Sequence, residues 1–268
     1  MNHKMAVEIN SHIQIPLSVI ENFSYFLKTE NNGHINKEKF VFVLDVKSKL
    51  IKEIRAKDYG AEHGYYSQDV EALLNESYES PLGEIKKKII TYSKHKIDEI
   101  TIDKKEFIAL KNYLKMLFYR NKKMYEDFLK FSKLPQESRP NVSEYIEICH
   151  KKNIDPIENL KSYSLTLLTT DSNRKFVNSF SGLGLFSSKD VSPNLLIFAP
   201  LCPEGGVLFF IPNTPNDIYM DPKIVDEKNV IEINKYICRT ECELSKDSLI
   251  SNCENELQEL IKYHEAFK

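Results

Sequence analysis

Most runs with strand character fall in one stretch of this chain, between residues 163 and 213, and runs with helical periodicity lie before and after it. Four short apolar runs fall in that stretch, separated by turn residues: YSLTLLTT, KFVNSF, NLLIFAPL and GGVLFFIPN. Consecutive strands that are joined by turns, without a helix between them, mostly pair antiparallel. The sequence therefore predicts an α+β fold with a small, mostly antiparallel sheet over about 163–213.

The first half is expected to be helical apart from one β-hairpin. We predict a first helix over 15–28, then a loop, then a hairpin formed by FVFVLDV at 40–46 and the LIKEI segment after it. Ser67 is placed to cap a helix, and Pro81 either ends that helix or starts the next one. The capping-box pattern from Asp103 to Glu106 predicts a long helix that extends to about Lys133.

The segment PQESRPN at 135–141 interrupts both periodicities and is the best candidate for a boundary. Short helices are expected at 143–151 and from Asp155, and two further helices at about 228–243 and 246–266 follow the sheet. The chain thus divides into a helical part with the hairpin, 1–134, and a part with the sheet and C-terminal helices, 141–268. We expect the two parts to pack as one unit.

The composition is that of an ordinary globular protein. Its 268 residues carry 37 basic and 39 acidic side chains, so the net charge of −2 gives the whole chain no attraction to nucleic acid or anionic membranes. No apolar run reaches the roughly 18 residues of a membrane span, and the first residues lack the pattern of a secretory signal. Five cysteines, an odd number, indicate reduced thiols. We therefore expect a cytoplasmic protein without membrane contact, and the frequent Lys, Asn and Ile are typical of an AT-rich bacterial or phage genome.

Several blocks in this chain follow one another in the order seen in a bacterial family called domain of unknown function 4238, which the sequence resembles. The blocks are IPLSVIENF, YYSQDVEALLNESYES with Glu79, YLKMLFYRNKKM with Arg120, FVNSFSGLG, FAPLCPEGGVLFFI, and INKYI with Asn234. The chain departs from the family pattern in two blocks. The His expected at Ile13 stands one residue earlier, as His12, and Phe180 and Gly182 occupy the positions of an Asp and a Pro.

The resemblance implies a fold rather than a reaction. Members of the family occur in bacterial defence settings, which points toward phage or host nucleic acid as a target. His12, Glu79 and Arg120 are the candidate catalytic residues that follow from this resemblance and from side-chain chemistry. A His near neutral pH transfers protons, an Arg holds a phosphate, and a Glu orients either one, a set that suits RNA cleavage without a metal. The alternative is that Glu79 and Arg120 form a buried ion pair between helices that only fixes their packing.

Two further groups are candidates for nucleic-acid binding. The rings of Tyr65 and Tyr66 could stack on bases, although tyrosines at a helix start more often pack locally. Lys122 and Lys123 beside Arg120 could contact phosphates, although such charges usually form a solvated face. Among metal ligands, Cys238, Cys242, Cys253 and His264 lack the spacing of a zinc knuckle, so ordinary thiols are favoured and neither a metal nor a cofactor is predicted.

Two functions of different class remain open on these residues. The first is a defence-associated effector that cleaves RNA. The second is a non-catalytic regulator or inhibitor that binds a protein partner, favoured by the displaced His and the missing Asp. Edge strands of the predicted sheet would also allow a homo-oligomer. The chain contains no P-loop, no G-x-G-x-x-G, no H-E-x-x-H and no G-x-S-x-G, which disfavours the enzyme classes that depend on them.

Overall fold

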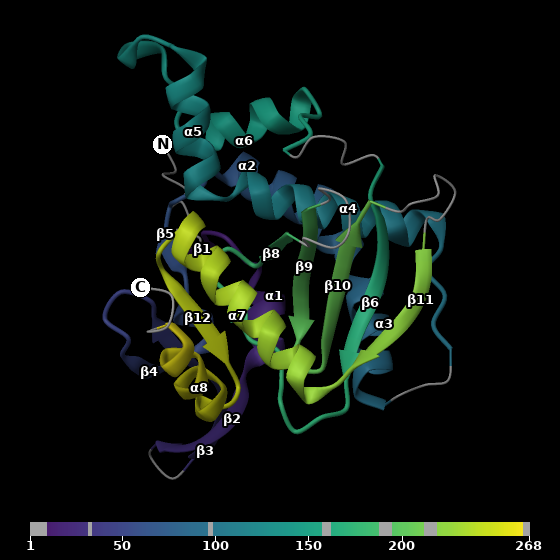
Figure 1. Ribbon diagram of the computed structural model, residues 1–268. Coiled ribbons are helices and arrows are strands. Elements are labelled where there is room, and N and C mark those ends of the chain that lie inside the picture. Colours follow the sequence, from purple (N-terminus) through teal and green to yellow (C-terminus); the bar gives the residue numbers. More distant parts are fainter. Residues whose placement is uncertain are drawn as a thin grey trace.

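The computed structural model describes residues 10–31, 34–95, 99–156, 162–187, 195–211 and 219–264, and it confirms the α+β class (Figure 1). The helices are α1 (Leu17–Ile20), α2 (Gln68–Leu74), α3 (Ser80–His95), α4 (Lys104–Tyr119), α5 (Lys122–Ser132), α6 (Val142–Lys151), α7 (Glu227–Leu244) and α8 (Glu254–His264). A π-helical turn, Asn75–Glu79, joins α2 to α3, and 3-10 turns lie at Glu21–Phe23, Ala56–Asp58 and Gln136–Ser138. No helix in these ranges is long and apolar enough to cross a bilayer.

The strands of the described ranges form two larger sheets and one short pair. They are β1 (Asn10–His12), β2 (Tyr25–Asn31), β3 (His34–Asp45), β4 (Ile51–Arg55), β5 (Ala61–His63), β6 (Ser164–Thr170), β7 (Asn178–Ser179), β8 (Gly184–Ser187), β9 (Leu195–Cys202), β10 (Gly205–Phe210), β11 (Tyr219–Val225) and β12 (Ser248–Ser251). One sheet has the order β11-β6-β10-β9-β8, the other has β2-β3-β12-β7 with β4 also paired to β3, and β1 pairs with β5.

The sheet built on β6, β9 and β10 is the predicted one, and its pairs are antiparallel except that β11 runs parallel to β6. Because side chains alternate along a strand, its two faces enter different hydrophobic clusters. Leu165 and Leu167 of β6 join the cluster that contains α3 and α4, whereas Leu168 joins the cluster that contains α7. Figure 1 shows α7 lying across one face of this sheet, with α3 on the other.

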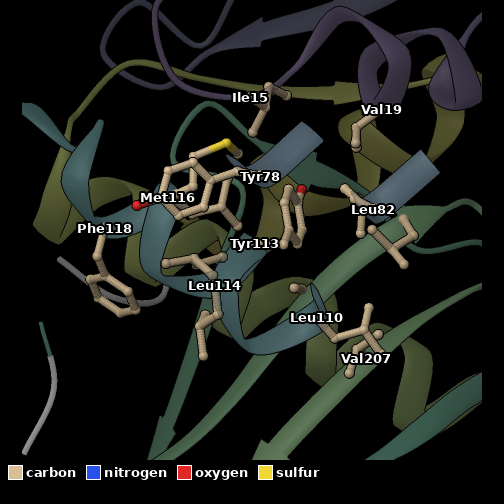
Figure 2. Packing of buried hydrophobic residues seen from close by; sticks show 14 of the residues in the cluster. Ile15, Val19, Tyr78, Leu82, Leu110, Tyr113, Leu114, Met116, Phe118 and Val207 are labelled. Carbon is tan, nitrogen blue, oxygen red and sulfur yellow. The ribbon is translucent and has the colours of Figure 1, made fainter. Parts of the chain in front are cut away.

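The second sheet joins chain segments that are about 200 residues apart. Strand β12 lies between β3 and β7, with Leu249 opposite Leu44 on one side and opposite Ser179 on the other. The larger hydrophobic cluster likewise contains residues of both 1–134 and 141–268. Figure 2 shows this packing, in which Leu110 of α4 lies near Val207 of β10.

Two predicted helices are shorter in the structure than expected, because pairing with distant strands outweighs local periodicity. The helix expected over 15–28 ends at Ile20, and a 3-10 turn leads into β2, which pairs with β3 from Tyr25 opposite Phe40. The helix expected over 246–266 begins only at Glu254, since residues 248–251 form β12. The predicted hairpin at 40–46 and 50–54 is confirmed as β3–β4.

Two further differences concern helix ends. Pro81 is the second residue of α3, in agreement with a helix start there, but it does not interrupt the helical run, because the π-helical turn leads directly from α2 into α3. The long helix expected to reach Lys133 is divided into α4 and α5, because Asn121 adopts an extended conformation and its side chain caps α5 at the Met124 N–H. The helix expected from Asp155 falls largely on residues 157–161, outside the described ranges. The predicted caps at Ser67 and Asp103 are confirmed.

Gly182, between β7 and β8, provides a test of this packing. Its φ of +75° suits glycine, and a Cβ there would lie 2.6 Å from Ile15 Cγ2 and 2.9 Å from Leu117 Cδ2. We expect Gly182→Ala to lower the free energy of unfolding by roughly 2–4 kcal/mol in urea titrations, from backbone strain and overpacking together.

Gly64 is the matched control. Its φ is +64° and nothing lies within 4 Å of the corresponding Cβ, so Gly64→Ala meets the backbone strain alone, about 1 kcal/mol. If the free energy of unfolding fell equally in the two variants, the close approach of Gly182 to Ile15 and Leu117 would be contradicted.

Candidate functional site

The three candidate catalytic residues lie around one open cavity of about 300 Å³. His12 comes from β1, Glu79 from the last position of the π-helical turn, and Arg120 from the junction of α4 and α5. Ser18, Glu21 and Glu71 complete the polar part of the wall. Three segments that are far apart in the sequence are thus brought together.

His12 is positioned by the pairing of β1 with β5. It lies opposite Ala61, and the next residue donates from Ile13 N to the Gly60 carbonyl at 2.9 Å. The ring nitrogen Nδ1 of His12 lies 3.2 Å from the backbone oxygen of Tyr59. A carbonyl oxygen only accepts hydrogen bonds, so Nδ1 carries the proton and Nε2 is the nitrogen available as a base.

Burial lowers the pKa of His12 below its usual value of 6.5. Desolvation is the largest cause, and the positive charge of Arg120 acts in the same direction. The hydrogen bond with Tyr59 and the carboxylates of Glu79 and Glu71 raise the pKa but do not offset the burial. The imidazole is therefore neutral at pH 7, the form that accepts a proton.

Glu79 owes its place to the π-helical turn. The Ser80 N–H bonds to the Asn75 carbonyl, five residues back, which inserts one extra residue into the helix. In a regular α-helix, residues seven apart share a face and residues eight apart diverge by about 80°. The extra residue brings positions eight apart onto one face, and this places Glu71 of α2 in the same cavity wall as Glu79.

Arg120 is held on several sides. Its Nη2 donates to Glu79 Oε1 at 2.8 Å and its Nη1 to the Gln14 carbonyl at 3.3 Å, while the guanidinium lies 5.6 Å from the ring centre of Tyr66. The Tyr66 hydroxyl in turn donates to the Ile13 carbonyl. The Arg120 side chain is 2% exposed and that of Glu79 is 26% exposed, so the buried cation is fixed and its partner faces the cavity.

Several buried polar atoms in this region lack a hydrogen-bond partner among the described residues. They include Arg120 Nε, Glu71 Oε1 and both side-chain atoms of Gln14. Native folds leave few such atoms, and because these are buried, a ligand would reach them only after a side chain moves.

The cavity wall is acidic. Glu21 pairs with Lys39 at 2.7 Å and Glu79 pairs with Arg120, whereas Glu71 forms no ion pair with any described residue. Lys86 lies behind the wall, where its Nζ donates to the Ser18 carbonyl at 3.1 Å and burial lowers its pKa. Sequence reasoning missed Glu71, because only the π-helical turn brings it beside Glu79.

The residues expected to bind nucleic acid lie outside this cavity or beneath it. Tyr66 is 4% exposed and contacts Arg120, so its ring is not accessible to a base in this structure. Tyr65 is half-buried and packs edge-on against Tyr66. Lys122 and Lys123 are exposed in the first turn of α5, and Lys123 pairs with Asp127 at 2.9 Å.

In the later blocks of the family resemblance, Phe180 and Asn234 make packing contacts and hydrogen bonds within the fold. Phe180, at the position where an Asp was expected, packs edge-on against Tyr59 at 6.0 Å between ring centres. Asn234 bridges α7 to the segment before β7 by accepting from the Val177 N–H and donating to the Lys175 carbonyl. Within the described part of the chain, no three His, Cys, Asp or Glu side chains are grouped to hold a metal ion.

Comparisons of the chain with models of protein families, with curated proteins and with solved structures find no match. The resemblance to the bacterial family therefore stays a prediction that rests on the quoted blocks.

The Arg120–Glu79 pair makes a prediction about stability. Removing one member of a buried pair leaves its partner without compensation, so we expect Arg120→Ala to lower the free energy of unfolding by about 3 kcal/mol. Lys123→Ala breaks an exposed pair and is expected to change it by less than about 0.5 kcal/mol. Urea unfolding of both variants measures the difference, and similar values would contradict the burial of Arg120.

The pKa of His12 makes a second prediction, measured by NMR titration of its ring. We expect a midpoint below 6.5, a lower one in Glu79→Gln, where a carboxylate is lost, and a higher one in Arg120→Gln, where a cation is lost. Because the folded pKa lies below the unfolded one, this group contributes stability that is complete above about pH 6.5 and is lost as the pH falls through the folded pKa. A higher midpoint in Glu79→Gln, or a lower one in Arg120→Gln, would refute the arrangement.

Proposed function

We propose that this chain cleaves RNA without a metal ion, as a defence-associated effector, with His12, Glu79 and Arg120 as its active site. The observation that carries the proposal is the convergence of these side chains from β1, the π-helical turn and the α4–α5 junction on one cavity. A neutral His and a fixed cation beside one cavity are components that such a reaction needs.

Each residue has a distinct role in the proposed reaction. His12 Nε2 takes the proton from a ribose 2′-hydroxyl, whose oxygen attacks the adjacent phosphorus. The bond from phosphorus to the 5′ oxygen breaks, the departing oxygen takes a proton from water, and a 2′,3′-cyclic phosphate remains. Arg120 stabilises the negative charge that grows on the phosphoryl oxygens, and Glu79 fixes the direction of its guanidinium.

A second function is favoured by the charge of the cavity. Arg120 is neutralised by Glu79, and Glu71 adds a carboxylate to the wall, which opposes the approach of a polyanion. An acidic, partly buried site suits a basic side chain of a protein partner. On this observation the chain would be a non-catalytic regulator or inhibitor.

Expression in a bacterial host separates the two functions. We expect the unaltered chain to slow growth and fragment total RNA, and His12→Gln to reduce cleavage by about 100-fold or more, because general base catalysis contributes a factor of this size. Purified protein should give 2′,3′-cyclic ends, work in the presence of a chelator, and leave a 2′-deoxy substrate intact.

The control for folding is Glu71→Gln, which keeps the shape of the cavity and removes the carboxylate that opposes phosphate. Under the cleavage proposal this variant stays active or binds RNA more tightly. Intact RNA with every folded variant, together with a protein partner that co-purifies and is lost in Glu71→Gln, would favour the regulator instead.

A further inference from the structure

A second cavity, of about 330 Å³, lies between α7 and α8 and is separate from the site above. Two thiols, Cys238 and Cys242, belong to its wall. They are four residues apart on α7 and therefore share one face of the helix. None of the five cysteines forms a disulfide, so both groups are present as thiols.

The two thiols interact directly. Cys238 is 6% exposed and Cys242 is half-buried, and a hydrogen bond between the two side chains is the first cause of the raised pKa of Cys238, followed by burial. Sulfur atoms within hydrogen-bonding range of each other are close enough to bind one ion between them. The cavity gives that ion access from outside.

Two basic side chains lie in the wall of this cavity beside the thiols. Lys235 and Arg239 contribute two cations to the wall, and Lys235 pairs with Glu232 at 2.6 Å. Arg239 pairs with Glu243 at 3.0 Å, and the Lys235 ammonium lies 4.0 Å from the ring centre of Tyr263. Two thiolates with one monovalent cation carry a charge of −1, and the two cations lie in the same wall as the thiols.

The number of donors indicates the class of ion. Zinc in structural sites takes four ligands, and the described part of the chain holds no group of three or more His, Cys, Asp or Glu side chains placed to bind a metal. Thiolates select soft ions, and two of them satisfy an ion that prefers two-coordinate, linear ligation. Leu260 adds an apolar side to the cavity, which disfavours a strongly hydrated ion.

We propose that Cys238 and Cys242 form a two-thiolate site for a soft monovalent metal ion of the Cu(I) class. Binding forms two sulfur–metal bonds and releases the two thiol protons to solvent, with no change of oxidation state. The site is independent of the proposed RNA cleavage, since none of its residues lies in the wall of the first cavity.

The test is an oxygen-free titration of the whole chain with Cu(I) in competition with a chromophoric chelator, repeated with Ag(I), which shares the linear geometry. We expect one ion per chain, bound through two sulfur atoms in X-ray absorption spectra. Because two protons leave, the apparent affinity should rise about 100-fold per pH unit between pH 6 and 7.

Cys242→Ser is the main variant, because this half-buried position tolerates the change better than Cys238, and it should lower the affinity at least 100-fold. Cys253→Ser is the matched control, a half-buried cysteine outside this cavity, and it should bind as the unaltered chain does. Circular dichroism melting confirms that both variants are folded.

Three results would overturn the proposal. The first is an unchanged Cu(I) affinity in Cys242→Ser. The second is a loss of Cu(I) affinity in Cys253→Ser as large as the loss in Cys242→Ser. The third is binding of Zn(II) with the same stoichiometry and comparable affinity, which would require donors that a two-thiolate site does not have.

Discussion

The pairing of β12 with both β3 and β7 is the interaction on which the rest of the structure depends. Four residues near the C-terminus complete a sheet whose other strands come from both parts of the chain. The same strand reaches the candidate site, because the Ser248 hydroxyl lies 3.0 Å from the Tyr59 hydroxyl and the Tyr59 carbonyl accepts from His12. The position of the candidate base is thereby connected to a strand more than 230 residues away.

The Arg120–Glu79 pair has the geometry of a structural ion pair, with one member almost fully buried. A buried pair without a cavity would satisfy its polar atoms within the protein. Here Arg120 Nε and Glu71 Oε1 have no partner among the described residues, and the pair borders a cavity with a neutral His. These features favour a site that binds a ligand, while Glu71 disfavours one that is strongly anionic.

Helix α7 has two functions in this architecture. One side packs against the central sheet through Val230 and Ile237, and Asn234 fixes the segment that leads into β7. Glu241, fully buried, accepts from the Ser181 and Asp247 N–H groups, and burial raises its pKa. Another side carries Cys238 and Cys242 toward α8, where the second cavity lies.

The sequence by itself determined the features that depend on neighbours along the chain. These are the caps at Ser67 and Asp103, the β3–β4 hairpin and the apolar strands of the central sheet, because capping, turns and periodicity act over a few residues. It also selected His12, Glu79 and Arg120, by resemblance and residue chemistry. Tertiary structure alone decided that β2 and β12 are strands, because their stability comes from partners far away in the chain. The tertiary structure also decided that Glu71 lies in the candidate site. A π-helical turn rotates Glu71 onto the helix face that carries Glu79, and no local sequence pattern predicted this turn.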